Sequence, residues 1–131
     1  MAKIERFEDL QVWILAREIC RFVTYLFETK PLKSNYAIRD QIERSSGSIM
    51  DNIAEGFERN GNKEFIQFLS IAKGSCGEVK SQSYRAFDKR LITEEQHKQL
   101  NEMAETTKNK IGSLMNYLRN TEIKGLKFKN D

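Results

Sequence analysis

The sequence predicts an all-α fold, an antiparallel up-down-up-down four-helix bundle, and three observations carry that prediction. Apolar residues recur at spacings of three and four along four long segments, and no stretch alternates with a period of two. The single proline, Pro31, and short polar clusters separate the four segments. Connections this short favour antiparallel neighbours, so the segments are expected to pack as a bundle.

Length and composition predict one domain, residues 1–131, that is soluble. The chain is 39% hydrophobic and 31% charged, which is typical of a globular protein. No run approaches the roughly 18 apolar residues of a membrane span, and the N-terminus lacks an apolar signal region. We therefore expect a cytoplasmic protein with no membrane association.

The first two helices are expected at about residues 9–29 and 35–58. Asp9 is the expected N-cap of the first helix, and the sequence ETKP ends it. Its apolar seam consists of Val12, Ala16, Ile19, Val23 and Leu26. The second helix follows Ser34, and its seam consists of Ile38, Ile42, Ser45, Ile49, Asn52 and Gly56.

The third and fourth helices are expected at about 63–90 and 94–121, followed by a basic tail at 122–131. The third seam consists of Phe65, Leu69, Ala72, Cys76, Val79, Ser83 and Phe87. Thr93 and Gln96 match a capping box at the start of the fourth helix. The fourth seam consists of Leu100, Ala104, Thr107, Ile111, Leu114 and Leu118.

The two cysteines, Cys20 and Cys76, are isolated in the sequence and fall on apolar stripes. Small core residues in a reducing compartment are the expected role for such cysteines, rather than a disulfide or a metal pair.

The first helix carries more apolar surface than one bundle seam needs. Outside its seam it holds Trp13, Ile14, Leu15, Cys20, Phe22, Tyr25 and Phe27. A helix that is apolar around most of its circumference is usually covered on more than one side, so we expect a homo-oligomer. The alternative is that the chain itself covers the surplus, through Phe7, the tail residues Leu126 and Phe128, or the bundle.

The stretch RSSGSIMDNIAEG, residues 44–56, is expected to be helical although it holds three serines and two glycines, which are poor helix formers. Helical spacing places a polar ribbon on one flank of this helix, facing a matching flank of the third. The ribbon consists of Gln41, Arg44, Ser48, Asn52 and Glu55, with Ser75, Glu78 and Gln82 opposite. Interhelical hydrogen bonds that fix the register are the structural interpretation.

The catalytic alternative for the ribbon is a proton-transfer pair of Glu55 with Arg44 or Glu78. Gly74 and Gly77, inside the third helix, are expected at a close helix contact.

The net charge of +3, from 22 basic and 19 acidic side chains, does not by itself argue for nucleic-acid binding. From Lys108 onward, however, the sequence holds six bases and two acids. These bases are Lys108, Lys110, Arg119, Lys124, Lys127 and Lys129. Such a basic end is a candidate surface for phosphate, and a solvated helix face with a frayed tail is the alternative.

The sequence offers little for catalysis. Glu94 and His97 form one Glu-x-x-His pattern, but di-metal bundle sites need a second such motif and further glutamates. His97 is the only histidine, and the glycines are too scattered to form a phosphate loop. We therefore predict no catalytic residue, no metal site and no cofactor.

Three stretches carry a family resemblance: FEDLQVW near the N-terminus, QIERSSGSIMDNIAEGFER over 41–59, and KEFIQFLSIAKGSCGEV over 63–79. They resemble the four-helix bundle proteins encoded in intervening sequences of bacterial 23S ribosomal RNA genes, across about positions 7 to 118. Similar proteins include the accessory proteins of diversity-generating retroelements. The resemblance implies a ring-shaped oligomer, typically a pentamer with a central channel, and no enzymatic activity. The retroelement members are associated with a reverse transcriptase and nucleic acid.

Together these features predict a non-enzymatic, oligomeric scaffold or accessory protein that contacts RNA or DNA through backbone phosphates. The alternative is a protein-interaction adaptor without a nucleic-acid role.

Overall fold

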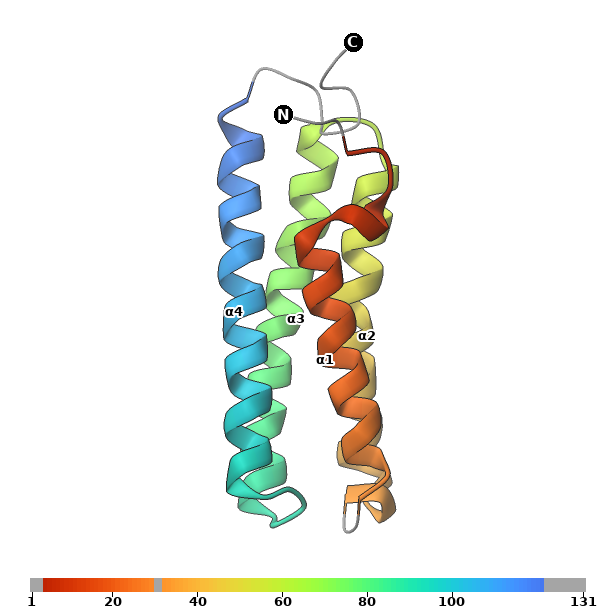
Figure 1. The fold of residues 1–131 in the computed structure, drawn as a ribbon, viewed down its shortest axis with the longest axis vertical. Coiled ribbons are helices and arrows are strands. Elements are labelled where there is room, and N and C mark those ends of the chain that lie inside the picture. Colours follow the sequence, from red (N-terminus) through yellow and green to blue (C-terminus); the bar gives the residue numbers. More distant parts are fainter. Residues whose placement is uncertain (1–3, 30–31, 122–131) are drawn as a thin grey trace.

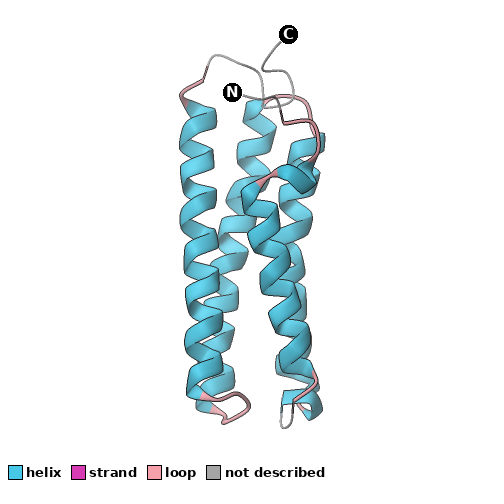
Figure 2. Ribbon diagram, in the orientation of Figure 1, coloured by secondary structure: helices cyan, strands magenta, loops and turns pink. Residues whose placement is uncertain are grey.

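The computed structural model describes residues 4–29 and 32–121, and four α-helices account for most of them. The helices are α1 (Gln11–Phe27), α2 (Tyr36–Glu58), α3 (Asn62–Asp88) and α4 (Glu94–Arg119), with short 3-10 turns η1 (Phe7–Asp9) and η2 (Leu32–Ser34) before α1 and α2. No strand occurs within those two ranges (Figure 2). The all-α prediction is confirmed, and the predicted helix ends differ from the observed ones by at most two residues.

The four helices lie side by side with their long axes roughly aligned (Figure 1). The end of α1, the start of α2 and the α3–α4 loop lie at one end of the bundle, and the α2–α3 loop lies at the other. Helices that are neighbours in sequence contact each other, and α4 contacts α1. The four apolar faces therefore meet in one shared core.

Most of the predicted seam residues are buried, and on α1 all five of them are. Three residues predicted at seams, Asn52, Phe87 and Leu114, are only half-buried because they lie at the border of the core face, and Met115 is buried beside Leu114. Fully buried large side chains from all four helices fill the centre, among them Ile19, Leu26, Ile42, Ile49, Leu69, Leu100 and Ile111. None of the helices in the described ranges is long and apolar enough to cross a membrane.

The helix ends show which capping predictions hold. Thr93 and Gln96 form the predicted capping box: the Gln96 N–H donates to Thr93 Oγ1 at 3.1 Å, and the Thr93 N–H donates to Gln96 Oε1 at 2.9 Å. Asn35 caps α2 by accepting a hydrogen bond from the Ile38 N–H at 3.2 Å. The prediction that Asp9 caps the first helix is wrong, because η1 contains Asp9 and Leu10 takes the N-cap position.

The glycines of α2 and α3 differ in their surroundings. A Cβ built on Gly56 would lie 2.6 Å from Phe68 Cβ, so α2 and α3 approach closely where position 56 lacks a side chain. Gly74 and Gly77 are exposed, and apart from the adjacent backbone of α3 no described atom lies within 4 Å of a Cβ built on either. The prediction of a close helix contact at Gly74 and Gly77 is therefore wrong within this chain.

Candidate functional site

Three members of the predicted polar ribbon meet where α2 packs on α3. The Ser75 hydroxyl donates to Ser48 Oγ at 2.9 Å across the interface. The Asn52 amide, one turn along α2, donates to both Ser48 Oγ and the Ser48 carbonyl at 2.9 Å. Ser75 is buried, so these hydroxyl and amide groups satisfy one another in place of water and help to hold the α2–α3 register.

The other ribbon residues do not join this cluster. Gln41 accepts a hydrogen bond from Arg85 of α3 at 2.7 Å, farther along the same interface. Glu55 pairs with Arg59 of its own helix at 3.2 Å. In the described part of the chain, no hydrogen bond or ion pair joins Glu55 to Arg44 or Glu78, both of which are exposed. The geometry therefore does not form the proton-transfer pair considered as the catalytic alternative.

Gln82 lies on the same flank of α3 and is half-buried. Its Oε1 atom is buried without a hydrogen-bond partner among the described residues.

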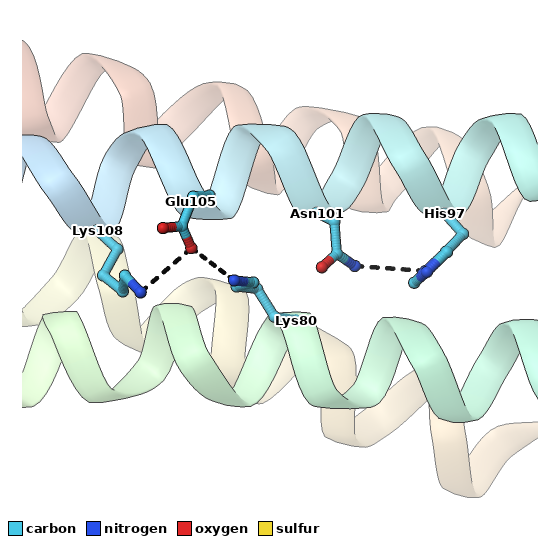
Figure 3. Close-up of polar contacts among 5 residues, drawn as sticks. All are labelled: Lys80, His97, Asn101, Glu105 and Lys108. Atoms are coloured by element: carbon cyan, nitrogen blue, oxygen red, sulfur yellow. Dashed lines mark hydrogen bonds and ion pairs between the residues drawn. The ribbon is translucent and has the colours of Figure 1, made fainter.

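Two lysines converge on one carboxylate between α3 and α4 (Figure 3). Lys80 Nζ lies 2.5 Å from Glu105 Oε1, and Lys108 Nζ lies 3.2 Å from the same oxygen. Hydrogen bonds from Lys80 and Lys108 lower the pKa of Glu105, so its carboxylate stays ionised. Lys108, a predicted phosphate ligand, is thus already paired within the chain.

The remaining predicted basic residues do not form one patch in the described structure. Lys108 and Lys110 are two residues apart, which places them about 200° apart around α4. Lys110 is exposed and lines a depression with Leu10 and Val12 on the α1 side. Arg119 is exposed at the end of α4 and donates to Asn116 Oδ1 at 3.2 Å. Outside the described residues lie Lys124, Lys127 and Lys129.

His97 belongs to the core between α3 and α4 rather than to a metal site with Glu94. Its Nδ1 atom lies 2.7 Å from the Ser83 hydroxyl and 3.3 Å from the Asn101 amide nitrogen (Figure 3 shows the second contact). Its ring stacks on Phe87 at 5.1 Å between centroids and meets Tyr84 edge-on at 4.4 Å.

Glu94 pairs instead with Lys98, at 3.8 Å. Among the residues that the structure describes, no group of three His, Cys, Asp or Glu side chains could hold a metal ion.

The predictions from the sequence do not include the His97 contacts, although the sequence contains a signal for them. Ser83 belongs to the predicted third seam, and His97 lies three residues before the seam residue Leu100, hence on the same face of its helix.

The two cysteines are free thiols with little nucleophilic character. Burial raises the pKa of Cys76 to about 12, and burial also raises the pKa of the half-buried Cys20. The thiolate is the reactive form, so both thiols are largely unreactive near neutral pH.

One open depression, of about 310 Å³, lies beside the α3–α4 loop. Among the described residues, Glu94 is the only carboxylate that lines it. The lining residues are Thr29, Phe87, Arg90, Leu91, Ile92, Thr93, Glu94 and Gln96. This arrangement supplies no nucleophile with an adjacent base.

Comparison with known proteins gives a family and a fold. Residues 8–113 match the family model described as 23S rRNA-intervening sequence protein. The chain is also similar to the crystal structure of a protein of unknown function from the S23 ribosomal protein family of Bacteroides thetaiotaomicron VPI-5482. That match has 24% sequence identity and a TM-score of 0.73, and covers 79% of this chain and 97% of the other. No curated protein matches the chain.

Proposed function

This chain belongs to the 23S rRNA-intervening sequence protein family, and we propose that it is a non-enzymatic, homo-oligomeric helical scaffold or accessory protein that holds RNA or DNA by backbone phosphates. The α2–α3 cluster and the His97 contacts support a non-enzymatic role, because their polar groups pair with one another inside the bundle. The proposal includes the antiparallel up-down-up-down order, which the alternating ends of the connections support (Figure 1).

The observation that supports the assembly is that two large apolar side chains of α1 are exposed in the single chain. Ile14 is 46% exposed and Tyr25 is 52% exposed. They are eleven residues apart, about three helical turns, so they lie on one side of α1, with the exposed Arg21–Glu18 ion pair between them. Of the predicted alternative, Phe7 packs on Trp13, with ring centroids 5.2 Å apart, while Leu126 and Phe128 lie outside the described residues. A second copy that covered Ile14 and Tyr25 would remove large apolar side chains from water.

Light scattering on the eluting peak of a gel-filtration column tests the assembly. We expect the wild type to run as a closed oligomer, and the family resemblance favours a ring, typically a pentamer. Changing Ile14→Glu and Tyr25→Glu together should lower the mass, because the new charges would be desolvated at the contact. Tyr36→Glu, at an aromatic residue 64% exposed at the start of α2, is the control and should leave the mass unchanged. If the wild type has the mass of a monomer, the proposed homo-oligomer is wrong.

The nucleic-acid part of the proposal is supported by an excess of bases in one half of the α3–α4 pair. Residues 62–80 of α3 and 105–119 of α4 hold six bases and three acids, whereas residues 81–104, which include the α3–α4 loop, hold four bases and four acids. The two basic halves lie side by side, since Lys80 contacts Glu105 and the Asn62 amide donates to the Leu118 carbonyl at 3.0 Å. The sequence resemblance to retroelement accessory proteins is a second reason to propose this partner.

Binding to oligonucleotides of mixed sequence, followed as a function of salt, tests the partner. Phosphate contacts predict sequence-tolerant binding that weakens steeply as salt rises. Changing Lys124→Glu, Lys127→Glu and Lys129→Glu together tests whether the basic tail contributes to oligonucleotide binding. Absence of any binding by the wild type at low salt would favour the protein-interaction adaptor instead.

A further inference from the structure

We propose that the interface of α3 and α4 around Glu105 is a binding track for the phosphate backbone of RNA or DNA, formed by Lys73, Lys80, Lys108 and Arg119. This inference rests on the proposed function and assigns its nucleic-acid contact to a definite place. The four residues are called the lysine track below. Only Lys108 and Arg119 of the track belong to the basic set that the sequence indicated.

The lysine track has three levels that repeat every seven residues. At the first level, Lys80 and Lys108 meet at Glu105 (Figure 3). At the second, seven residues farther on each helix, Lys73 Nζ lies 3.9 Å from a Cβ built on Gly112, so its ammonium group reaches across to α4. Arg119 gives the third level, seven residues beyond Gly112. Seven residues are about 10 Å of helix, so the track is about 20 Å long.

The charges on the lysine track are not balanced by acidic groups of the described residues. Glu105 Oε1 accepts both Lys80 and Lys108, so one carboxylate faces two ammonium groups. In the ranges that the structure describes, no carboxylate forms an ion pair with Lys73 or Arg119. Four cations and one anion along one interface attract polyanions, and their mutual repulsion is relieved when an anion binds.

The spacing favours a polymer of phosphates over a single small anion. Levels about 10 Å apart cannot be bridged by one phosphate group, whereas a nucleic-acid strand places a phosphate within reach of each level. Between the levels, glycines leave the helix surface without side chains. Gly77 lies between Lys73 and Lys80 in sequence, and nothing lies within 4 Å of a Cβ built on it, while Gly112 leaves space under Lys73. A strand can therefore approach the helix backbone closely.

A variant that binds more tightly is the sharpest test of this site. Removing a lysine would weaken binding of a polyanion at any place on the protein, and so would not identify the site. The probe is a fluorescein-labelled RNA of about 20 nucleotides and mixed sequence, with a DNA of the same sequence as the second arm. Changing Glu105→Gln removes the carboxylate that pairs with Lys80 and Lys108, and we expect about threefold tighter binding at low salt. Glu43→Gln makes the same charge change at an exposed site on α2, and it should alter binding less.

A loss of binding tests the other two levels. Changing Lys73→Gln together with Arg119→Gln should reduce the slope of log K against log salt by about 1.5, since each phosphate contact contributes about 0.7 to 0.9. Lys33→Gln, exposed in η2, is the control and should leave the slope near the wild-type value. Far-UV circular dichroism on each variant checks that the helices are intact.

The outcomes distinguish failure of the lysine track from failure of the proposed nucleic-acid binding on which it rests. If the wild type binds RNA or DNA but the Glu105 and Lys73–Arg119 variants bind like their controls, the lysine track is overturned and the proposed function stands. If the wild type binds neither probe at low salt, both fail. If the variants change binding to vesicles of anionic lipid but not to RNA or DNA, the partner assigned to the track is wrong.

Discussion

The close approach of α2 and α3 at Gly56 predicts that two glycine-to-alanine changes in one helix act in opposite directions. A Cβ at position 56 would lie 2.6 Å from Phe68 Cβ and 3.0 Å from Phe65 Cδ1. Phe68 Cβ is attached directly to the α3 backbone, so rotation of the side chain does not move it away. Gly56→Ala therefore forces the two helices apart. Gly47→Ala places its methyl group in open space, since nothing lies within 4 Å.

The magnitudes follow from these surroundings. Overpacking a well-packed contact costs about 1 to 3 kcal/mol, and alanine in place of glycine returns at most about 1 kcal/mol of helix stability, less near a helix end. Gly56 is two residues from the end of α2, so we expect Gly56→Ala to destabilise the fold by about 1 to 2 kcal/mol. For Gly47→Ala, in the middle of the helix, we expect a gain of about 0.5 to 1 kcal/mol.

Urea denaturation followed by far-UV circular dichroism measures both variants. All proteins must be compared at one protomer concentration, because an oligomer gains apparent stability with concentration. Thermal denaturation should show the same signs, with about 3 to 5 °C per kcal/mol for a chain of this length. If Gly56→Ala raises the stability as much as Gly47→Ala does, the backbones are not in close contact at Gly56 and the reasoning fails.

Three further predictions concern stability. Arg90 follows the end of α3 with a φ of 61°, and the Leu91 N–H beside it donates to the Ala86 carbonyl at 2.9 Å. Glycine adopts this left-handed conformation without strain, so Arg90→Gly should raise the free energy of unfolding by about 0.5 to 1 kcal/mol, measured by urea denaturation. Ser83→Ala removes the 2.7 Å contact with His97 and should cost about 1 to 2 kcal/mol, whereas the exposed Ser81→Ala should change the same measurement by less than about 0.5. Burial raises the pKa of Cys76 from 9.0 to about 12, so the unfolded thiol ionises first and stability is lost as pH rises above 9. The wild type should therefore lose up to about 1.4 kcal/mol more per pH unit than Cys76→Ala between about pH 9 and 11, and parallel curves would contradict the burial.

The fold could be predicted because its determinants are local. The five predicted seam residues of α1 are all buried, and the Thr93–Gln96 capping box depends on residues only three positions apart. The prediction that Asp9 caps α1 is wrong for a local reason as well. Its side chain suits an N-cap, but the Leu10 N–H bonds to the Phe7 carbonyl at 2.9 Å, which closes a 3-10 turn before the helix starts. Propensity gives the residue type of a cap, while competing turns decide its position.

The candidate sites could be predicted only in part, because their contacts depend on the register between helices. Helical spacing placed Ser48 and Ser75 on facing flanks, and the structure joins them. Spacing within one helix cannot tell that Glu105 stands level with Lys80, twenty-five residues earlier in the chain. That pairing converts Lys108 from a free cation into part of an ion-pair cluster. Gly74 and Gly77 show the same limitation. Glycine is typical of close helix contacts, but the sequence of one helix does not say whether another helix lies against it, and here none does within the described residues.

The Ser48–Asn52–Ser75 cluster and the Glu105 cluster differ in net charge, and that difference is the reason to propose a ligand for the second alone. At the α2–α3 contact, the hydroxyl and amide groups of Ser48, Asn52 and Ser75 are neutral and bond to one another, so they have no net charge to attract a partner. At the α3–α4 contact, Glu105 is shared by Lys80 and Lys108, and Lys73 adds another positive charge one level along. Hydrogen bonds can be satisfied within a chain, but excess charge of one sign cannot be, and counterions or a polyanion must neutralise it.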